Sequence, residues 1–144
     1  MQYVELIRLY FDRSTALQWY WTVYVVVIGG LLAFSSLRQR PDLVTAVLVT
    51  VLYCFFAYKN LGAIRDVTGE RHAVLAALKE FEPAGPEAAA VARQRQLIEP
   101  TLVAPPYAGI RNFHVASDVL TVAALWAMEW RRWRKHRASD PGPI

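Results

Sequence analysis

The sequence predicts an all-α integral membrane protein with about three transmembrane helices, and three observations carry this prediction. Hydrophobic residues make up 55% of the 144 residues, and the mean hydropathy is +0.21. The usual apolar share of a soluble domain is roughly 45–50%. Residues 16–34 and 43–58 contain no charged side chain, and a dense basic run follows a third apolar stretch. We therefore expect a single membrane domain, built from an antiparallel helical hairpin and a third span.

The first span is predicted at residues 15–36. A helix of the charge-free stretch 16–34 covers about 28 Å at 1.5 Å per residue, close to the roughly 30 Å hydrocarbon core. Thr15 and Gln18 have the spacing of a capping box. The aromatic residues near its start are typical of a membrane interface; they are Trp19, Tyr20, Trp21 and Tyr24.

The preceding segment, residues 1–14, lacks the pattern of a cleavable secretory signal and is expected to be an interfacial helix. Its predicted apolar face lies on the membrane surface and consists of Tyr3, Leu6, Ile7, Tyr10 and Phe11.

The second span is predicted at residues 42–64, after the start signal Pro41-Asp42. Residues 65–111 are expected to be extramembrane and helical. Thr68 can cap a first helix that ends near Phe81, with an apolar stripe formed by Val74, Leu75, Leu78 and Phe81. Pro86 suits the start of a second helix reaching about Ile98, and the proline-rich residues 100–106 should be irregular.

Residues 112–136 are predicted to hold the third span and a basic tail. On the insertion scale, the five strongly apolar residues of this run favour insertion by roughly 2 kcal/mol, whereas Asp118 at a helix centre costs about 3. The charge bias supports a third crossing, because Arg38 and Arg40 place the first connection inside and the basic tail places the C-terminus inside. This topology puts the N-terminus and residues 59–111 outside.

One side of the third run is predicted to be a polar transmembrane stripe, formed by His114, Asp118, Thr121 and Glu129. Ionisable residues inside spans usually face a cavity or a partner, so the stripe can be a proton or cation path in which His114 and Asp118 share a proton. The alternative is structural. Ser117 or Asp118 then caps the helix at the membrane surface, and Glu129 pairs with Arg132.

A face of the first span is rich in small and polar residues, namely Gln18, Thr22, Gly29, Ala33 and Ser36. Small residues four apart let another helix approach closely. We expect this face to pack against the second span, with homo-oligomer contact as the alternative.

The lipid bilayer is the expected partner of the aromatic and basic residues at the interfaces, which are Trp19, Trp21, Trp130, Arg131, Arg132, Trp133, Arg134 and Lys135. Beside a span, these residues favour anionic lipid heads over nucleic acid. The three histidines are scattered, Cys54 is the sole cysteine, and no phosphate loop or nucleophile motif is present. The sequence therefore predicts no enzyme activity, no metal and no cofactor.

Two functions remain open from the sequence. The first is a membrane-anchoring or accessory protein that presents its amphipathic helical segment to an unidentified membrane partner. The second is a homo-oligomeric channel or transporter component that uses the polar stripe of the third span. The Ala- and Arg-rich composition favours a multi-pass protein of a bacterial inner membrane with a cytoplasmic C-terminus.

Overall fold

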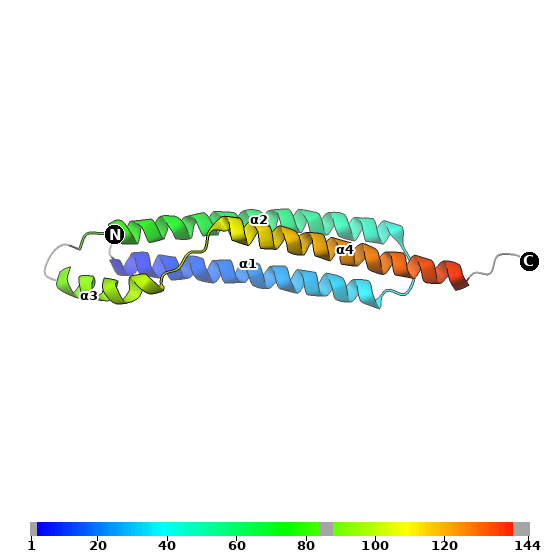
Figure 1. The fold of residues 1–144 in the computed structure, drawn as a ribbon, viewed down its shortest axis with the longest axis horizontal. Helices are drawn as coiled ribbons and strands as arrows, with labels where there is room; N and C mark the ends of the chain where they lie inside the picture. Colours follow the sequence, from blue (N-terminus) through cyan, green and yellow to red (C-terminus); the bar gives the residue numbers. More distant parts are fainter. Residues whose placement is uncertain (1–2, 84–87, 140–144) are drawn as a thin grey trace, which may run out of the picture. The chain divides into compact units, whose positions relative to one another are not determined.

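The computed structural model describes residues 3–83 and 88–139, and all of its regular structure is helical (Figure 1). This confirms the predicted all-α class. The chain runs through four α-helices and one short 3-10 turn, in the order α1 (Tyr3–Leu37), α2 (Leu43–Glu80), α3 (Ala88–Ile98), η1 (Glu99–Thr101) and α4 (Tyr107–Ser139). Two of these helices, α1 and α2, are long and apolar enough to cross a membrane by length and composition.

Helices α1 and α2 are both longer than the sequence predicted. No proline interrupts residues 3–37 or 43–80, so each helix continues where a boundary was expected. Thr15 and Thr68 are therefore not caps, and these two predictions were wrong. Both hydroxyls lie inside a helix and donate to the carbonyl four residues back, that of Phe11 at 3.0 Å and that of Ile64 at 2.6 Å.

The other helix ends follow the sequence more closely. Helix α2 begins directly after Asp42, as predicted, and α3 ends at Ile98, as predicted. The predicted start of that helix at Pro86 lies outside the described residues. The proline-rich connection is irregular over residues 102–106, although η1 adds one helical turn before it.

The described chain forms two compact units. Unit 1 contains residues 1–20 and 62–110, and unit 2 contains residues 21–61 and 111–144. That the chain is a single membrane domain stays a prediction.

Unit 1 has an apolar core between the first turns of α1 and the last turns of α2. The buried side chains of this core are Tyr3, Leu6, Tyr10, Val74, Leu78 and Leu102. The stripe predicted on residues 74–81 is thus covered by the N-terminal segment of the same chain. The prediction that Tyr3, Leu6 and Tyr10 lie on a membrane surface was wrong, because their face is buried against α2.

A buried arginine fixes the irregular connection to this core. The Arg71 guanidinium donates to the Tyr10 hydroxyl at 3.0 Å and to the Val103 carbonyl at 3.1 Å. The Tyr10 hydroxyl donates to the same carbonyl at 2.9 Å. These bonds satisfy a backbone acceptor that no helix or strand occupies.

Unit 2 is built from the second part of α1, the first part of α2, and α4. Contacts between Ser35 and Arg132 and between Tyr24 and His114 show that α1 and α4 run in the same direction. Contacts of α4 with Asp42 and Tyr53 show that α2 runs the opposite way. Three helices of unit 2 therefore lie side by side (Figure 1).

Candidate functional site

The polar stripe of α4 faces the other two helices of unit 2. His114 is fully buried, and Thr121 and Glu129 are almost so. Asp118 is half-buried, with its side chain 21% exposed. The four predicted stripe residues thus lie on one face of α4, and their partners come from α1, α2, the α1–α2 connection and α4 itself. The prediction that Ser117 or Asp118 caps this helix was wrong, because α4 begins at Tyr107.

Asp118 is the centre of a hydrogen-bonded cluster that joins all three helices. Its Oδ2 lies 2.8 Å from His114 Nδ1 on the same helix. Its Oδ1 accepts the hydroxyl of Tyr24 from α1 at 2.8 Å and the hydroxyl of Tyr53 from α2 at 2.7 Å. One carboxylate thus contacts side chains of α1, α2 and α4.

The other ring nitrogen of His114 meets Asn60 of α2. His114 Nε2 lies 3.2 Å from Asn60 Nδ2. If the amide donates here, the imidazole is neutral with its proton on Nδ1, and that proton points at Asp118. Rotation of the Asn60 amide would bring its oxygen to the same place and accept a proton from a charged imidazolium. The cluster has hydrogen-bonding partners for both protonation states of His114.

Aromatic rings enclose the imidazole on the α1 side. The Tyr24 ring centroid lies 4.1 Å from that of His114, and the Trp21 centroid lies 5.9 Å from it. Tyr24 is fully buried, so it does not belong to the interfacial aromatic group in which the sequence placed it. Trp19, by contrast, is 65% exposed.

An apolar groove between α2 and α4 leads to Asp118. It has a volume of about 520 Å³. Its walls include Tyr53, Ala57 and Val122, and the Asp118 carboxylate is one of its few polar parts. The groove is the route by which Asp118, but not His114, can be reached from outside unit 2.

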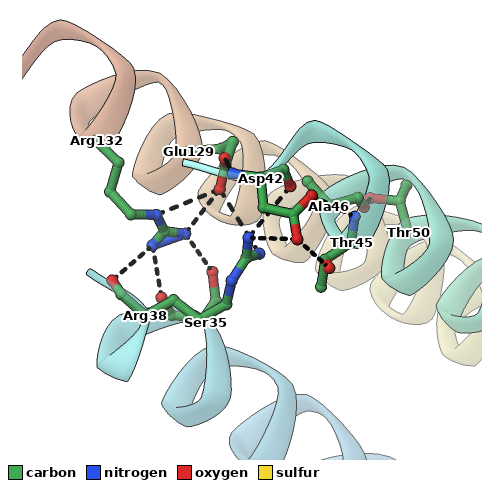
Figure 2. Close-up of polar contacts among 8 residues, drawn as sticks. All are labelled: Ser35, Arg38, Asp42, Thr45, Ala46, Thr50, Glu129 and Arg132. Carbon is green, nitrogen blue, oxygen red and sulfur yellow. Dashed lines mark hydrogen bonds and ion pairs between the residues drawn. The ribbon is translucent and has the colours of Figure 1, made fainter. Parts of the chain in front are cut away.

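A second polar cluster centres on Glu129, at the end of unit 2 where the α1–α2 connection lies (Figure 2). Glu129 Oε1 accepts the backbone N–H of Asp42 at 2.6 Å. Glu129 Oε2 lies 3.1 Å from Arg132 Nη2 and 3.7 Å from Arg38 Nη1. The sequence-based pairing of Glu129 with Arg132 is therefore confirmed.

Arg132 ties the end of α1 to α4. Its Nη1 donates to the Ser35 carbonyl at 2.6 Å, and its Nη2 donates to the Ser35 hydroxyl at 3.2 Å (Figure 2). Carbonyls at a helix C-terminus have no partner within the helix, and cations are favourable there. Arg132 was predicted to face lipid head groups, but its side chain is only 10% exposed. Its contacts are instead structural ones.

Asp42 lies in the connection between α1 and α2, directly before the first residue of α2. Its carboxylate accepts the backbone N–H of Thr45 at 3.2 Å and the Thr45 hydroxyl at 2.5 Å, which is an N-cap arrangement. These hydrogen bonds from Thr45 hold the pKa of Asp42 below its ordinary value, with a smaller contribution from Arg38.

The residues of the small-residue face of α1 are exposed in the described structure. Gly29, Ala33 and Ser36 are exposed, and a Cβ added at Gly29 would meet no atom within 4 Å. Gln18 and Thr22 are exposed on the same helix. The expected packing of Gly29 against the second span was therefore wrong, since α1 uses Tyr24 and Ser35 for its buried contacts. Contact with a second copy stays a prediction.

The remaining interfacial residues lie on the surface of unit 2. Trp130 is exposed, and Trp133 is exposed with the Arg137 guanidinium 3.8 Å from its ring centroid. Arg131, Arg134 and Lys135 are exposed as well.

Sequence reasoning found the stripe but missed its partners. Tyr24, Tyr53 and Asn60 lie in or beside apolar runs. There, a tyrosine is read as an interfacial or core residue. The available signal was spacing, because Tyr53 and Asn60 are seven residues apart and so share a face of α2.

Comparisons with models of protein families, with curated proteins and with solved structures find no match to this chain.

Proposed function

We propose that this chain is a multi-pass membrane protein that acts as a membrane-anchoring or accessory protein, with unit 2 in the bilayer and unit 1 in water. One observation carries the proposal: unit 2 buries several polar residues and exposes many large apolar ones. Five buried polar residues belong to it, namely Ser35, Asn60, His114, Thr121 and Glu129. Polar groups in membrane spans face the interior of the bundle in this way.

All three helices of unit 2 expose large apolar side chains. Examples are Val26 of α1 at 65%, Phe55 of α2 at 67% and Leu120 of α4 at 70% exposure. An apolar surface this extensive on every side is unfavourable in water and marks a membrane or interaction surface. Lipid would cover it without requiring a particular partner protein.

The same arrangement supports a third span through α4. Asp118 made insertion of this run marginal by the scale used above, since a lone carboxylate in a span is costly. In unit 2 the carboxylate is hydrogen-bonded to three side chains from all three helices. Val119 and Leu120 point outward instead. The free-energy cost of inserting Asp118 is therefore lower when α4 inserts together with α1 and α2 than when it inserts as an isolated helix.

The charge bias is consistent with this topology. The Glu129 cluster brings Arg38 of the first connection and Arg132 of the basic tail to the same end of unit 2. Positive residues beside spans favour the cytoplasmic side. We propose that this end is cytoplasmic and that residues 62–110 are on the opposite side.

The anchoring role follows from the difference between the units. The apolar stripe of residues 74–81 was predicted to contact a partner, but it is buried in the core of unit 1. Unit 1 is thus a helical unit with its own core, and unit 2 would hold it at the membrane.

Alkaline extraction combined with trypsin tests this proposal. Membranes containing the protein are washed at alkaline pH, and sealed right-side-out vesicles are treated with trypsin. We expect the protein to remain in the pellet and to be cleaved at the exposed Arg93 in α3, whereas the basic tail after Trp133 is protected. Release into the alkaline supernatant would contradict the proposal.

A second candidate function, proton handling, is favoured by the His114–Asp118 pair. The pair is buried or nearly so, has partners for two protonation states of His114, and meets the outside through the groove at Asp118. A homo-oligomeric pore around the stripe is less favoured, because its residues already bind partners within the chain.

Flux in liposomes tests the second candidate. The Asp118→Asn variant should abolish dissipation of a pH gradient that the wild-type protein causes, while Asp42→Asn leaves it unchanged. Absence of proton flux by the wild-type protein in sealed liposomes would exclude this function and leave the anchoring role.

A further inference from the structure

A basic pocket lies between α1 and α4 of unit 2, beside the Glu129 cluster. Its volume is about 410 Å³. Four cationic side chains line it, together with Ser36, Gln39 and Met128, and these cations are Arg38, Arg131, Arg132 and Lys135. Two carboxylates contact the arginines of this pocket: Glu129 faces Arg38 and Arg132, and Asp42 lies 3.9 Å from Arg38.

An apolar groove continues from this pocket along α1 and α4. Its volume is about 580 Å³, and its apolar walls include Leu32 and three alanines, Ala33, Ala124 and Ala127. Ser36, Met128 and Arg131 line both the pocket and the groove. The two hollows are therefore continuous, with a cationic end and an apolar end.

Arg131 lies at the junction of the two hollows. Arg38 and Arg132 share the Glu129 carboxylate, as Figure 2 shows. Arg131, by contrast, forms no hydrogen bond or ion pair with any described residue. Its guanidinium offers a planar set of donors that matches the geometry of a phosphate.

We propose that this pocket and groove bind one anionic phospholipid. The phosphate contacts Arg131, with Arg38 and Lys135 nearby, and an acyl chain lies in the groove over Ala124 and Ala127. Charge complementarity selects the anionic head group, because each cation near a membrane surface attracts anionic lipid by about 1 kcal/mol. The apolar groove selects a lipid over a free phosphate or an acidic peptide, neither of which has a chain to fill it.

This inference rests on the proposed function, since it requires unit 2 to be in a bilayer. Ala33 and Ser36 belong to the small-residue face predicted for helix packing, and both line the groove. At this end of α1, the face would therefore contact a lipid and not another helix. Lipid would cover this part of α1 without a second copy of the chain.

The test is native mass spectrometry of protein released from nanodiscs that contain phosphatidylcholine with or without phosphatidylglycerol. We expect the wild-type protein to retain one phosphatidylglycerol molecule in preference to phosphatidylcholine. Arg131→Gln should lower this retention about fivefold, the equivalent of about 1 kcal/mol. Ala127→Leu, which fills the groove, should lower it without changing the charge.

Two matched controls separate a site from a general attraction. Arg134→Gln removes the same charge from an exposed position of α4 that does not line the pocket, and Ala116→Leu adds the same bulk elsewhere on α4. Ala116→Leu should retain phosphatidylglycerol as the wild type does, and Arg134→Gln should lower retention less than Arg131→Gln does, because it removes only the general surface attraction. Equal losses in Arg131→Gln and Arg134→Gln would overturn the site, and so would displacement of the lipid by inorganic phosphate.

The same samples distinguish failure of this inference from failure of the proposed function. Flotation with liposomes after an alkaline wash reports whether the protein is inserted. A wild-type protein that floats but does not prefer phosphatidylglycerol overturns the lipid site alone. A wild-type protein that does not float overturns the membrane assignment and, with it, the site.

Discussion

Unit 1 buries mainly apolar side chains and unit 2 buries more polar ones, although α1 and α2 contribute to both. Unit 1 has an apolar core around Tyr10 and Leu78. Unit 2 has an interior with polar clusters around Asp118 and Glu129. Of the 25 exposed large hydrophobic side chains among the described residues, 20 belong to unit 2. Under the proposed function, this difference matches water around unit 1 and lipid around unit 2.

The comparison also shows which interactions hold each unit together. Apolar burial is the dominant stabilising term in water, so Leu78 and its neighbours are expected to stabilise unit 1. Between helices in lipid there is little hydrophobic driving force, and packing and interhelical hydrogen bonds take its place. In unit 2, the bonds of Asp118 and Arg132 join all three helices.

The largest expected effect is in the core of unit 1. Leu78→Ala should lower the free energy of unfolding of unit 1 by about 2–5 kcal/mol, since Leu78 is fully buried and its truncation leaves a cavity. Hydrogen exchange of the α2 amides after residue 62 measures the change. The control Val4→Ala removes an exposed side chain and should change stability by less than about 0.5 kcal/mol. Equal effects of the two variants would show that this core is not formed.

An arginine introduced at equally exposed positions of the two units should affect membrane insertion in unit 2 but not in unit 1. Leu52 in unit 2 and Val4 in unit 1 are each 60% exposed. Leu52→Arg should disfavour membrane insertion by about 3 kcal/mol, because the guanidinium would enter lipid. Val4→Arg should have no effect on insertion, because its surroundings are water. Glycosylation-based insertion assays measure both, and tolerance of arginine at Leu52 would contradict a lipid-facing surface.

Removal of the Asp118 carboxylate should have opposite effects on insertion and on folding. Asp118→Leu should favour insertion of an isolated α4 segment, because the cost of the carboxylate is removed. In the full chain it should lower the resistance of unit 2 to unfolding by roughly 1–2 kcal/mol, since His114, Tyr24 and Tyr53 lose their acceptor. Unfolding in sodium dodecyl sulfate measures the second effect. A more stable full chain would show that the cluster does not hold the helices.

The smallest expected effect concerns the start of α2. Asp42→Ala should lower the thermal midpoint slightly, because it removes the cap on α2. The pKa of Asp42 is lowered in the folded protein, so its contribution is present above the ordinary pKa of aspartate and is lost as the pH falls through the lowered value. The difference between variant and wild type should therefore shrink on acidification. Glu82→Ala, at an exposed position, serves as the control, and a difference that grows in acid would contradict the capping role.

The sequence predicted the class of fold and the polar face of α4, because both are local patterns. Charge-free runs and helical periodicity were sufficient to predict the apolar parts of α1 and α2 and the polar face of α4 that includes His114 and Asp118. Helix boundaries at Thr15 and Thr68 were wrong because a good capping residue does not end a helix that lacks a breaker. The partners of the stripe were missed because Tyr24 and Asn60 reach it only through tertiary packing. The exposure of Gly29 was likewise not predictable, because only tertiary packing decides which face of α1 is buried.

Cysteine labelling of intact cells tests the central claim, that unit 2 crosses the membrane three times, most directly. In a Cys54→Ser background, single cysteines at the exposed positions Ala92 and Ala138 are treated with a membrane-impermeant thiol reagent. We predict labelling at position 92 and protection at position 138 until the membrane is permeabilised. Equal labelling or equal protection of the two positions in intact cells would place them on the same side and contradict a third span through α4.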